Sequence, residues 1–240
     1  MKSKNIQRIV LQVVVVSVAI YLLETISYFY IAEQAGAFFG INNTLNLQLP
    51  FDRLTPWFTP LFAIYIPWPF IWFVVLPLVM YLSGGKKSYY QYVVNSFFMY
   101  IIGSIIYALM PSTTTPRDFI DGTINVLSPA APFYDTIKNL SRSGDNIWGS
   151  FPSYHNYWAA LFIFFAFKNG TRWFWRYPMI LMGVLISLST LFLHQHCLLD
   201  IIITYAMTVW FMKIIDEHSL DTRFEMFLDK LFRKGTIPRH

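Results

Sequence analysis

The chain has 240 residues, of which 55% are hydrophobic and only 13% are charged, and its mean hydropathy is +0.45. Soluble domains carry about 25% charged residues, so this composition excludes an ordinary soluble enzyme and predicts an integral membrane protein. The net charge of +5 comes from clustered cations rather than a basic stripe, so we expect no nucleic-acid partner. The single cysteine, Cys197, excludes an internal disulfide.

Six apolar runs are long enough, or nearly long enough, to cross a bilayer as helices, which takes about 20 residues each. They cover roughly 9–31, 61–82, 90–110, 153–168, 174–194 and 197–216. The first run follows a basic N-terminus and has no small-residue cleavage site, so we interpret it as a retained helix rather than a signal peptide. We expect an all-α fold in which residues 1–240 form one multi-pass domain, a bundle of six transmembrane helices.

The positions of the cations predict how this bundle is oriented. All but four of the 18 Lys and Arg residues lie before the first run, between the second and third, between the fourth and fifth, or at the end of the sixth and beyond. The exceptions are Arg53, Arg117, Lys138 and Arg142. The positive-inside rule then makes both termini cytoplasmic in the cell membrane, and it places the loops before 153 and around 194–197 outside.

Three further features fit a membrane protein. Residues 32–60 mix Leu, Trp and Phe with few charges, so we expect them to lie at the membrane interface. The tail, 217–240, alternates charged and apolar residues and is expected to be an amphipathic cytoplasmic helix on anionic lipid. Glu24 lies inside the first run. A carboxyl group there either has a functional role or forms a hydrogen bond to a neighbouring helix.

The candidate chemistry lies at the ends of the last three runs. His196 and Asp200 are four residues apart, so on a helix they share a face and can touch. A carboxylate bound to one imidazole nitrogen makes the other nitrogen a better nucleophile, which here can attack phosphorus. A second histidine, His155, starts the fourth run on the same side and can protonate a leaving group. A lone histidine at a helix end is more often a capping or interfacial residue, but three polar groups at one membrane face weaken that interpretation.

Neighbouring residues are candidates for binding the phosphate. Ser153 either caps the fourth helix or donates to a phosphate oxygen, and the helix N-terminus attracts anions. Arg117 is the best candidate for a bidentate phosphate clamp. His194 forms a His-x-His pair with His196, which suggests a metal, but further ligands are not evident and we favour a substrate or neighbour contact. We expect Cys197 to be a packing residue.

Two motifs resemble those of the type 2 phosphatidic acid phosphatase (PAP2) superfamily. Ser189 and Thr190, followed by His196 and Asp200, resemble its third motif, Ser-Arg-x5-His-x3-Asp. The stretch from Pro152 to His155 resembles its Pro-Ser-Gly-His motif, in the Phe-Pro-Ser-x-His form of the inositol phosphorylceramide synthase branch. The resemblance covers roughly 100–210. It implies that His196 is the nucleophile, Asp200 its partner and His155 the proton donor. It also implies that Ser189 and Thr190 contact the phosphate, and that the reaction uses no metal or cofactor.

The chain departs from this pattern at two places. Thr190 stands where the third motif has Arg, and only Pro116-Arg117 is similar to the first motif, Lys-x6-Arg-Pro. Lys138 and Arg142 are candidate replacements. The predicted function is therefore a phosphatase that acts on a lipid phosphate monoester or diphosphate at the outer membrane face. The alternatives are a phosphotransferase that moves a phospho-headgroup to a lipid hydroxyl, and a non-catalytic lipid-binding or transport protein.

Overall fold

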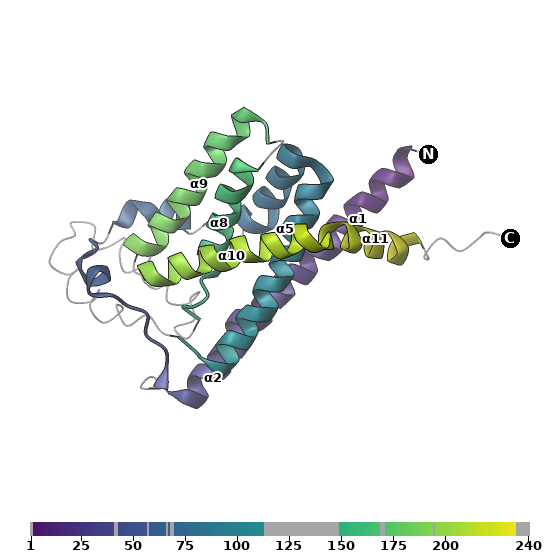
Figure 1. Cartoon of the computed structure of the whole chain (residues 1–240). Coiled ribbons are helices and arrows are strands. Elements are labelled where there is room, and N and C mark those ends of the chain that lie inside the picture. The colour runs from purple at the N-terminus through teal and green to yellow at the C-terminus, as the bar shows by residue number, and fades with distance from the viewer. Residues whose placement is uncertain are drawn as a thin grey trace.

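The computed structural model describes residues 2–40, 43–56, 58–65, 67, 70–112, 149–168, 171–193 and 195–233. Within these ranges the fold is all-α, as predicted, and the only extended pairing consists of isolated bridges of Ser112 with Leu45 and with Gly149. Figure 1 shows the long helices and the approach of α8, α9 and α10 toward one another at one end. Arg117, Lys138, Arg142 and His194 lie outside the described residues.

The chain begins with one long helix made of three parts. They are α1 (Lys2–Thr25), the π-helical turn η1 (Ile26–Ile31) and α2 (Ala32–Phe39). Glu24 is buried near the end of α1 and accepts a hydrogen bond from the hydroxyl group of Tyr100, at 2.8 Å. Of the two roles considered for Glu24, the structure therefore contains the hydrogen bond to a neighbouring helix, here α5.

Short helical turns follow between residues 50 and 65. They are η3 (Pro50–Leu54), η4 (Thr59–Leu61) and α3 (Phe62–Tyr65), of which η4 and α3 contact α9. The helix then resumes as η5 (Ile71–Val75) and α5 (Leu76–Leu109). Gly85 breaks α5 in two because its backbone has φ 72° and ψ −164°, a left-handed conformation that glycine adopts without a Cβ clash. In its described residues, the expected second run, 61–82, consists of the end of η4, α3, η5 and the start of α5 rather than one α-helix. The break at Gly85 follows this run.

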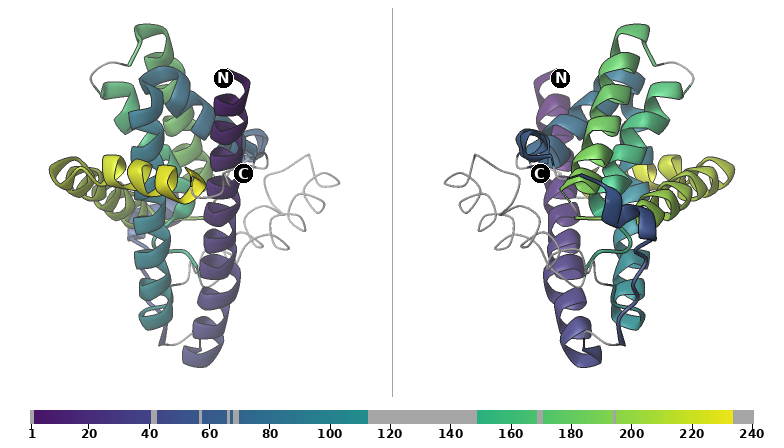
Figure 2. Two further views of the ribbon diagram at one scale, coloured as in Figure 1. Left: turned by 90° about the vertical axis from the view of Figure 1, so that its right-hand side faces the viewer. Right: turned by 90° about the vertical axis from the view of Figure 1, so that its left-hand side faces the viewer.

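The remaining helices are α8 (Tyr154–Phe167), α9 (Trp173–Phe192), α10 (Leu198–His218) and α11 (Leu220–Arg233). α8 packs along α9 and contacts α10 and α5. Gly183 of α9 permits the close contact between α9 and α8, because a Cβ at this position would lie 2.7 Å from the carbonyl oxygen of Ala159 in α8. Figure 2 shows α1 and the second half of α5 running alongside each other below this group.

Four helices in the described part of the chain are long and apolar enough to cross a membrane. They span Leu11–Phe39, Phe73–Leu109, Trp173–Phe192 and Leu198–His218. The expected fourth run is present as α8, but its 14 residues extend only about 21 Å, against about 30 Å of hydrocarbon. The chain therefore has the apolar helices of a membrane protein, and α8 is a short helix enclosed by its neighbours.

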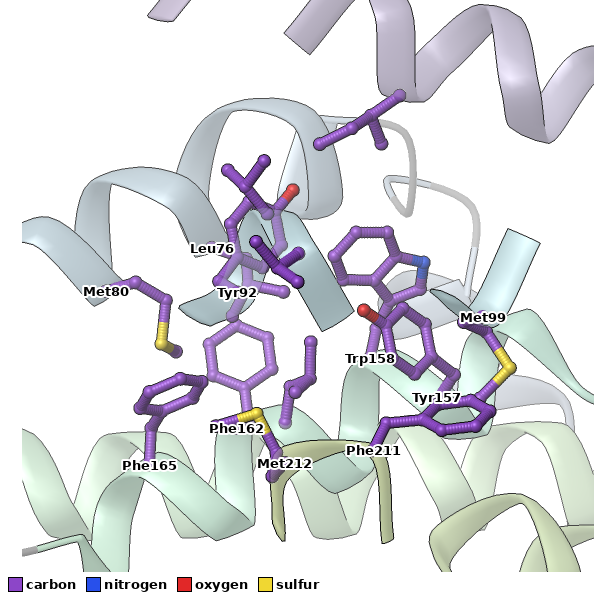
Figure 3. Close-up of a cluster of buried hydrophobic side chains, with 14 of the residues drawn as sticks. Leu76, Met80, Tyr92, Met99, Tyr157, Trp158, Phe162, Phe165, Phe211 and Met212 are labelled. Atoms are coloured by element: carbon purple, nitrogen blue, oxygen red, sulfur yellow. The ribbon is translucent and has the colours of Figure 1, made fainter. Parts of the chain in front are cut away.

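The core of the bundle is aromatic. Figure 3 shows Tyr92 of α5 beside Trp158 of α8, with Phe211 and Met212 of α10 below them. The ring centroids of Tyr92 and Trp158 are 5.3 Å apart. Such large, rigid side chains fix the positions of α5, α8 and α10 relative to one another. This packing determines where the ends of α8 and α10 meet.

Polar contacts secure the other end of the bundle. Lys168, just after α8, forms an ion pair with Asp216 of α10 at 3.5 Å. Gln91 of α5 donates to the same carboxylate at 2.5 Å. α11 has the amphipathic character expected for the tail, and it packs against α5 with Leu228 buried and Lys86 pairing with Glu225 at 3.6 Å.

Candidate functional site

The candidate site is built on the turn between α9 and α10. The amide groups of Gln195 and His196 both donate to the carbonyl oxygen of Thr190, at 2.8 and 3.2 Å. Cys197 then forms the N-cap of α10, so His196 lies just outside the helix rather than on its surface. Burial raises the pKa of the Cys197 thiol to about 12, which agrees with the packing role expected for this residue.

The His196 ring is oriented by two acceptors at one nitrogen. Nδ1 lies 2.6 Å from Oδ2 of Asp200 and 2.8 Å from the carbonyl oxygen of Ser150. A carbonyl oxygen can only accept, so Nδ1 carries the proton, and in the neutral ring Nε2 keeps its lone pair. The expected contact between His196 and Asp200 is thus present, and it leaves Nε2 chemically available.

The Asp200 carboxylate also holds the start of α8. Its second oxygen accepts hydrogen bonds from the Ser153 amide at 3.1 Å and from the Thr204 hydroxyl group at 3.2 Å. Only 1% of the Asp200 surface is exposed. A buried carboxylate of this kind is stable because each oxygen has a donor. One side chain therefore connects α10, the His196 turn and the N-terminus of α8.

Ser153 caps α8, one of the two roles expected for it. Its hydroxyl oxygen accepts hydrogen bonds from the amide group and the side-chain nitrogen of Asn156, at 3.2 and 2.9 Å. The same side-chain nitrogen donates to the hydroxyl oxygen of Thr190 at 3.0 Å. Thr190 and Ser189 in turn donate to α9 carbonyl groups. A neutral chain of hydrogen bonds thus occupies the position where the family's third motif has Arg.

His155 lies next to His196. The centroids of the two imidazole rings are 5.6 Å apart, and their planes are inclined by 52°. The ring of His155 also stacks on Tyr65 of α3, with 4.6 Å between centroids and only 7° between planes. Both histidines are mostly buried. The structure therefore brings both imidazoles, from different elements, close enough for one phosphate group to contact both.

The segment that precedes α8 is fixed by α5 and the residues after it. Tyr107 donates its hydroxyl group to the carbonyl oxygen of Pro152 at 2.6 Å. Ser112 accepts a hydrogen bond from the Phe151 amide at 2.6 Å, and its own hydroxyl group donates to the Phe151 carbonyl oxygen at 3.2 Å. The peptide bond between Phe151 and Pro152 is cis. These contacts hold the Ser150 carbonyl group beside His196.

The structure thus brings together five of the eight predicted site residues: Ser153, His155, Thr190, His196 and Asp200. The hydroxyl group of Ser189 donates to the Ile186 carbonyl oxygen within α9, and Arg117 and His194 are not among the described residues. Among those that are described, no group of three or more His, Cys, Asp or Glu residues is arranged to hold a metal ion.

Sequence reasoning missed three residues at this site. Asn156 could have been found from its spacing, because Ser153-x-x-Asn156 places a polar side chain over a helix N-terminus. Asp52 is the only acidic residue in the sequence between Glu33 and Asp118, and its Oδ1 accepts from the Leu198 amide at 2.8 Å. Tyr65 gives no signal, because it is one aromatic residue among many.

Comparison with known protein families agrees with this geometry. Residues 34–214 match the PAP2 superfamily, which is about three quarters of the chain and includes every residue of the site. A search of curated proteins and a search of solved structures found no match. Membership in this superfamily indicates phosphatase or phosphotransferase activity on lipid-like substrates. On the family match, together with the His196, Asp200 and His155 geometry, the chain belongs to the PAP2 superfamily.

Proposed function

We propose that the protein is a lipid phosphatase that hydrolyses a phosphate monoester or diphosphate of a membrane lipid. The observation that carries this proposal is the pair of acceptors at Nδ1 of His196, which leaves Nε2 unprotonated in the neutral ring. An imidazole that faces a second imidazole, with a buried carboxylate behind it, is suited to nucleophilic attack with proton transfer.

In the first step, Nε2 of His196 attacks phosphorus and a nitrogen–phosphorus bond forms. The bond between phosphorus and the leaving oxygen breaks, and protonated His155 donates its proton to that oxygen, which releases the lipid alcohol or lipid phosphate. Asp200 stabilises the positive charge that develops on the His196 ring. The Nδ1 proton stays on the ring throughout, because its two acceptors hold it there.

In the second step, water replaces the lipid. His155, now neutral, removes a proton from the water molecule as its oxygen attacks the phosphohistidine. The nitrogen–phosphorus bond breaks and inorganic phosphate leaves. Both catalytic residues then return to their starting protonation states. The N-terminus of α8, with Ser153 at its cap, provides a partial positive charge for the phosphate oxygens. Arg117 remains our candidate for the cationic clamp, with Lys138 and Arg142 as alternatives and His194 as a further substrate contact.

A phosphotransferase is the second candidate, and a specific observation favours it. Thr190 and Asn156 form a neutral pair where the family pattern has Arg, so this side of the site contributes no positive charge. A substrate phosphate with one negative charge, such as a phosphodiester, needs less compensation than a monoester with two. A lipid hydroxyl group would then replace water in the second step, as in the inositol phosphorylceramide synthase branch.

We place the site at the extracytoplasmic face, in a bundle that crosses the membrane six times. α8 and α10 both begin at the site, and their far ends carry Lys168 and Lys213. The positive-inside rule assigns that far end to the cytoplasm. α8 would cross as a short helix surrounded by protein, and the broken segment between 59 and 84 would complete a second short crossing.

The experiment that tests the function uses purified full-length protein in detergent and a panel of lipid phosphates, diphosphates and phosphodiesters. Both released phosphate and newly formed lipid are measured. Phosphate release without new lipid supports the phosphatase, and new phospholipid with little phosphate supports the transferase. Neither product, with lipid binding retained, supports a non-catalytic lipid-binding protein. His196→Ala is the control, and turnover that survives this change excludes His196 as the nucleophile.

A further inference from the structure

The segment from Pro50 to Tyr65 makes a direct contact with the helix that follows His196. Oδ1 of Asp52 accepts a hydrogen bond from the amide of Leu198, the first residue of α10, at 2.8 Å. Oδ2 of the same carboxylate accepts from the amide of Leu49 at 2.7 Å, which closes the turn η3. Asp52 is only 4% exposed. A buried carboxylate at a helix N-terminus accepts a hydrogen bond from an amide that has no partner inside the helix. Its negative charge also interacts favourably with the positive end of the helix dipole.

The end of the same segment contacts the other imidazole. The Tyr65 ring lies parallel to the His155 ring at 4.6 Å. Tyr65 also packs with Leu193, which directly precedes the His196 turn, and with Leu61. An aromatic face against an imidazole limits the rotation of its ring, and it attracts the ring further when the imidazole is protonated.

These two contacts lie at opposite ends of one short stretch of chain. Between them, the Phe58 amide donates to the carbonyl oxygen of Phe192, the last residue of α9, at 3.2 Å. The segment is therefore attached to α9, to α10 and to His155. Its other side is exposed, as Leu54 shows with 79% of its surface accessible. The polar and aromatic contacts face the site, so the segment forms one of its walls.

We infer that the segment from Pro50 to Tyr65 positions both catalytic imidazoles. Asp52 fixes the start of α10 and thereby the turn that carries His196, while Tyr65 fixes the ring of His155. This inference rests on the proposed function for the roles of the two histidines. It assigns positioning roles to two residues outside the motif stretches, more than 85 residues upstream of His155.

The two contacts predict different kinetic effects. Loss of the Asp52 contact displaces the nucleophile, and a displacement of about 1 Å costs roughly 10²-fold in rate. Asp52→Ala should therefore lower kcat for every substrate, with little change in KM. Loss of the Tyr65 ring disturbs proton donation, which matters most when the leaving oxygen is a poor leaving group. Tyr65→Leu should lower kcat strongly for dodecyl phosphate and much less for p-nitrophenyl phosphate.

The test measures kcat and KM of the full-length protein in detergent with these two phosphates. The variants are Asp52→Ala, Asp52→Asn, Tyr65→Leu and Tyr65→Phe, with Leu54→Ala as the control from the exposed side of the segment. Asp52→Asn keeps one acceptor oxygen and should give an intermediate kcat. Tyr65→Phe keeps the stacked ring and should retain most of the kcat that Tyr65→Leu loses on dodecyl phosphate.

A second measurement does not depend on turnover. Hydrogen exchange of the peptide that contains Leu198 should be faster in Asp52→Ala than in wild type and unchanged in Leu54→Ala. If wild type hydrolyses neither phosphate nor any phosphate or diphosphate of the lipid panel while the exchange result holds, the phosphatase proposal fails and the Asp52 contact stands. Unchanged exchange and unchanged kcat in Asp52→Ala overturn the inference for Asp52. Equal losses of kcat on both phosphates in Tyr65→Leu overturn it for Tyr65.

Discussion

Oδ2 of Asp200 lies 2.6 Å from Nδ1 of His196, although only Asp200 belongs to α10. The four-residue spacing suggested two side chains on one helix face. Instead, His196 lies in the turn before the helix, and Asp200 occupies its third position, from which side chains reach back over the N-terminus. This arrangement lets the Ser150 carbonyl group approach the same nitrogen, which would be difficult against the side of a helix.

The first prediction concerns Asp200→Asn. An amide can present its nitrogen to the ring as easily as its oxygen, so the Nδ1 proton is no longer favoured and the ring can adopt the wrong tautomer. In the Ser-His-Asp triad, the corresponding change lowers kcat about 10⁴-fold, and we expect a loss of roughly 10³–10⁴-fold here. The measurement is kcat on a lipid phosphate, with Ile202→Ala, an exposed neighbour on α10, as the control. A loss below tenfold would contradict the role proposed for Asp200.

The second prediction concerns His155→Gln, which keeps much of the side-chain volume but cannot donate a proton as an acid. Removal of a general acid costs roughly 10²–10⁴-fold. The loss should be large for an alkyl phosphate and small for p-nitrophenyl phosphate, whose leaving group needs no proton. Steady-state kinetics with both substrates provide the measurement. The same loss on both would instead indicate a binding role for His155.

Much of the fold and of the motif-bearing site could be predicted from the sequence, because the signals are local. The run at 153–168 predicted α8 within one residue at each end, and the sixth run predicted the start of α10 equally well. Ser153 was expected as a helix cap, and it is one. Helix caps, and contacts between residues a few positions apart, depend only on the neighbouring backbone, so they can be predicted from the sequence.

The rest depends on contacts between distant segments. Tyr65 and His155 meet only because α3 packs against the end of α9, and no local pattern indicates such a pairing. The division of the second run into η4, α3, η5 and the start of α5 also escapes a hydropathy pattern, because all of these pieces are apolar. The break at Gly85 falls in the gap between the second and third runs, where the glycine pair at 84–85 was the available signal.

The third prediction tests the close packing of α8 on α9. In Gly183→Ala the new Cβ would lie 2.7 Å from the Ala159 carbonyl oxygen, a backbone atom that cannot move without moving α8. Overpacking of this kind costs about 1–3 kcal/mol, so the melting temperature should fall. Turnover should fall as well, because α8 carries His155. Leu181→Ala, on the exposed face of α9, is the matched control and should change neither quantity.

The fourth prediction concerns the contact that fixes the segment before α8. Tyr107→Phe removes the hydroxyl group that donates to the Pro152 carbonyl oxygen, and it leaves a buried acceptor without this donor. The expected loss of stability is about 1–3 kcal/mol, measured as a lower melting temperature in detergent. Ile105→Ala, on the exposed side of the same helix, controls for general effects on α5. A Tyr107→Phe protein as stable as wild type would show that this hydrogen bond contributes little.

The fifth prediction concerns the side of the membrane on which the site lies, and the chain itself provides a suitable background. Its single cysteine, Cys197, is buried and its pKa is raised to about 12, so almost no thiolate is present at neutral pH to react with a maleimide. Cysteines introduced at exposed positions can therefore be labelled selectively without replacing Cys197.

Two positions distinguish the possible orientations. Leu54 is exposed on the segment beside the site, and Glu217 is exposed at the far end of α10. In intact cells, a membrane-impermeant maleimide should label Leu54→Cys and should label Glu217→Cys only after permeabilisation, because the cations at the Glu217 end place it in the cytoplasm. The unchanged chain controls for reaction at Cys197. The reverse labelling pattern would place the His155 and His196 pair on the cytoplasmic side, and the phosphate would then be removed from lipids of the inner leaflet.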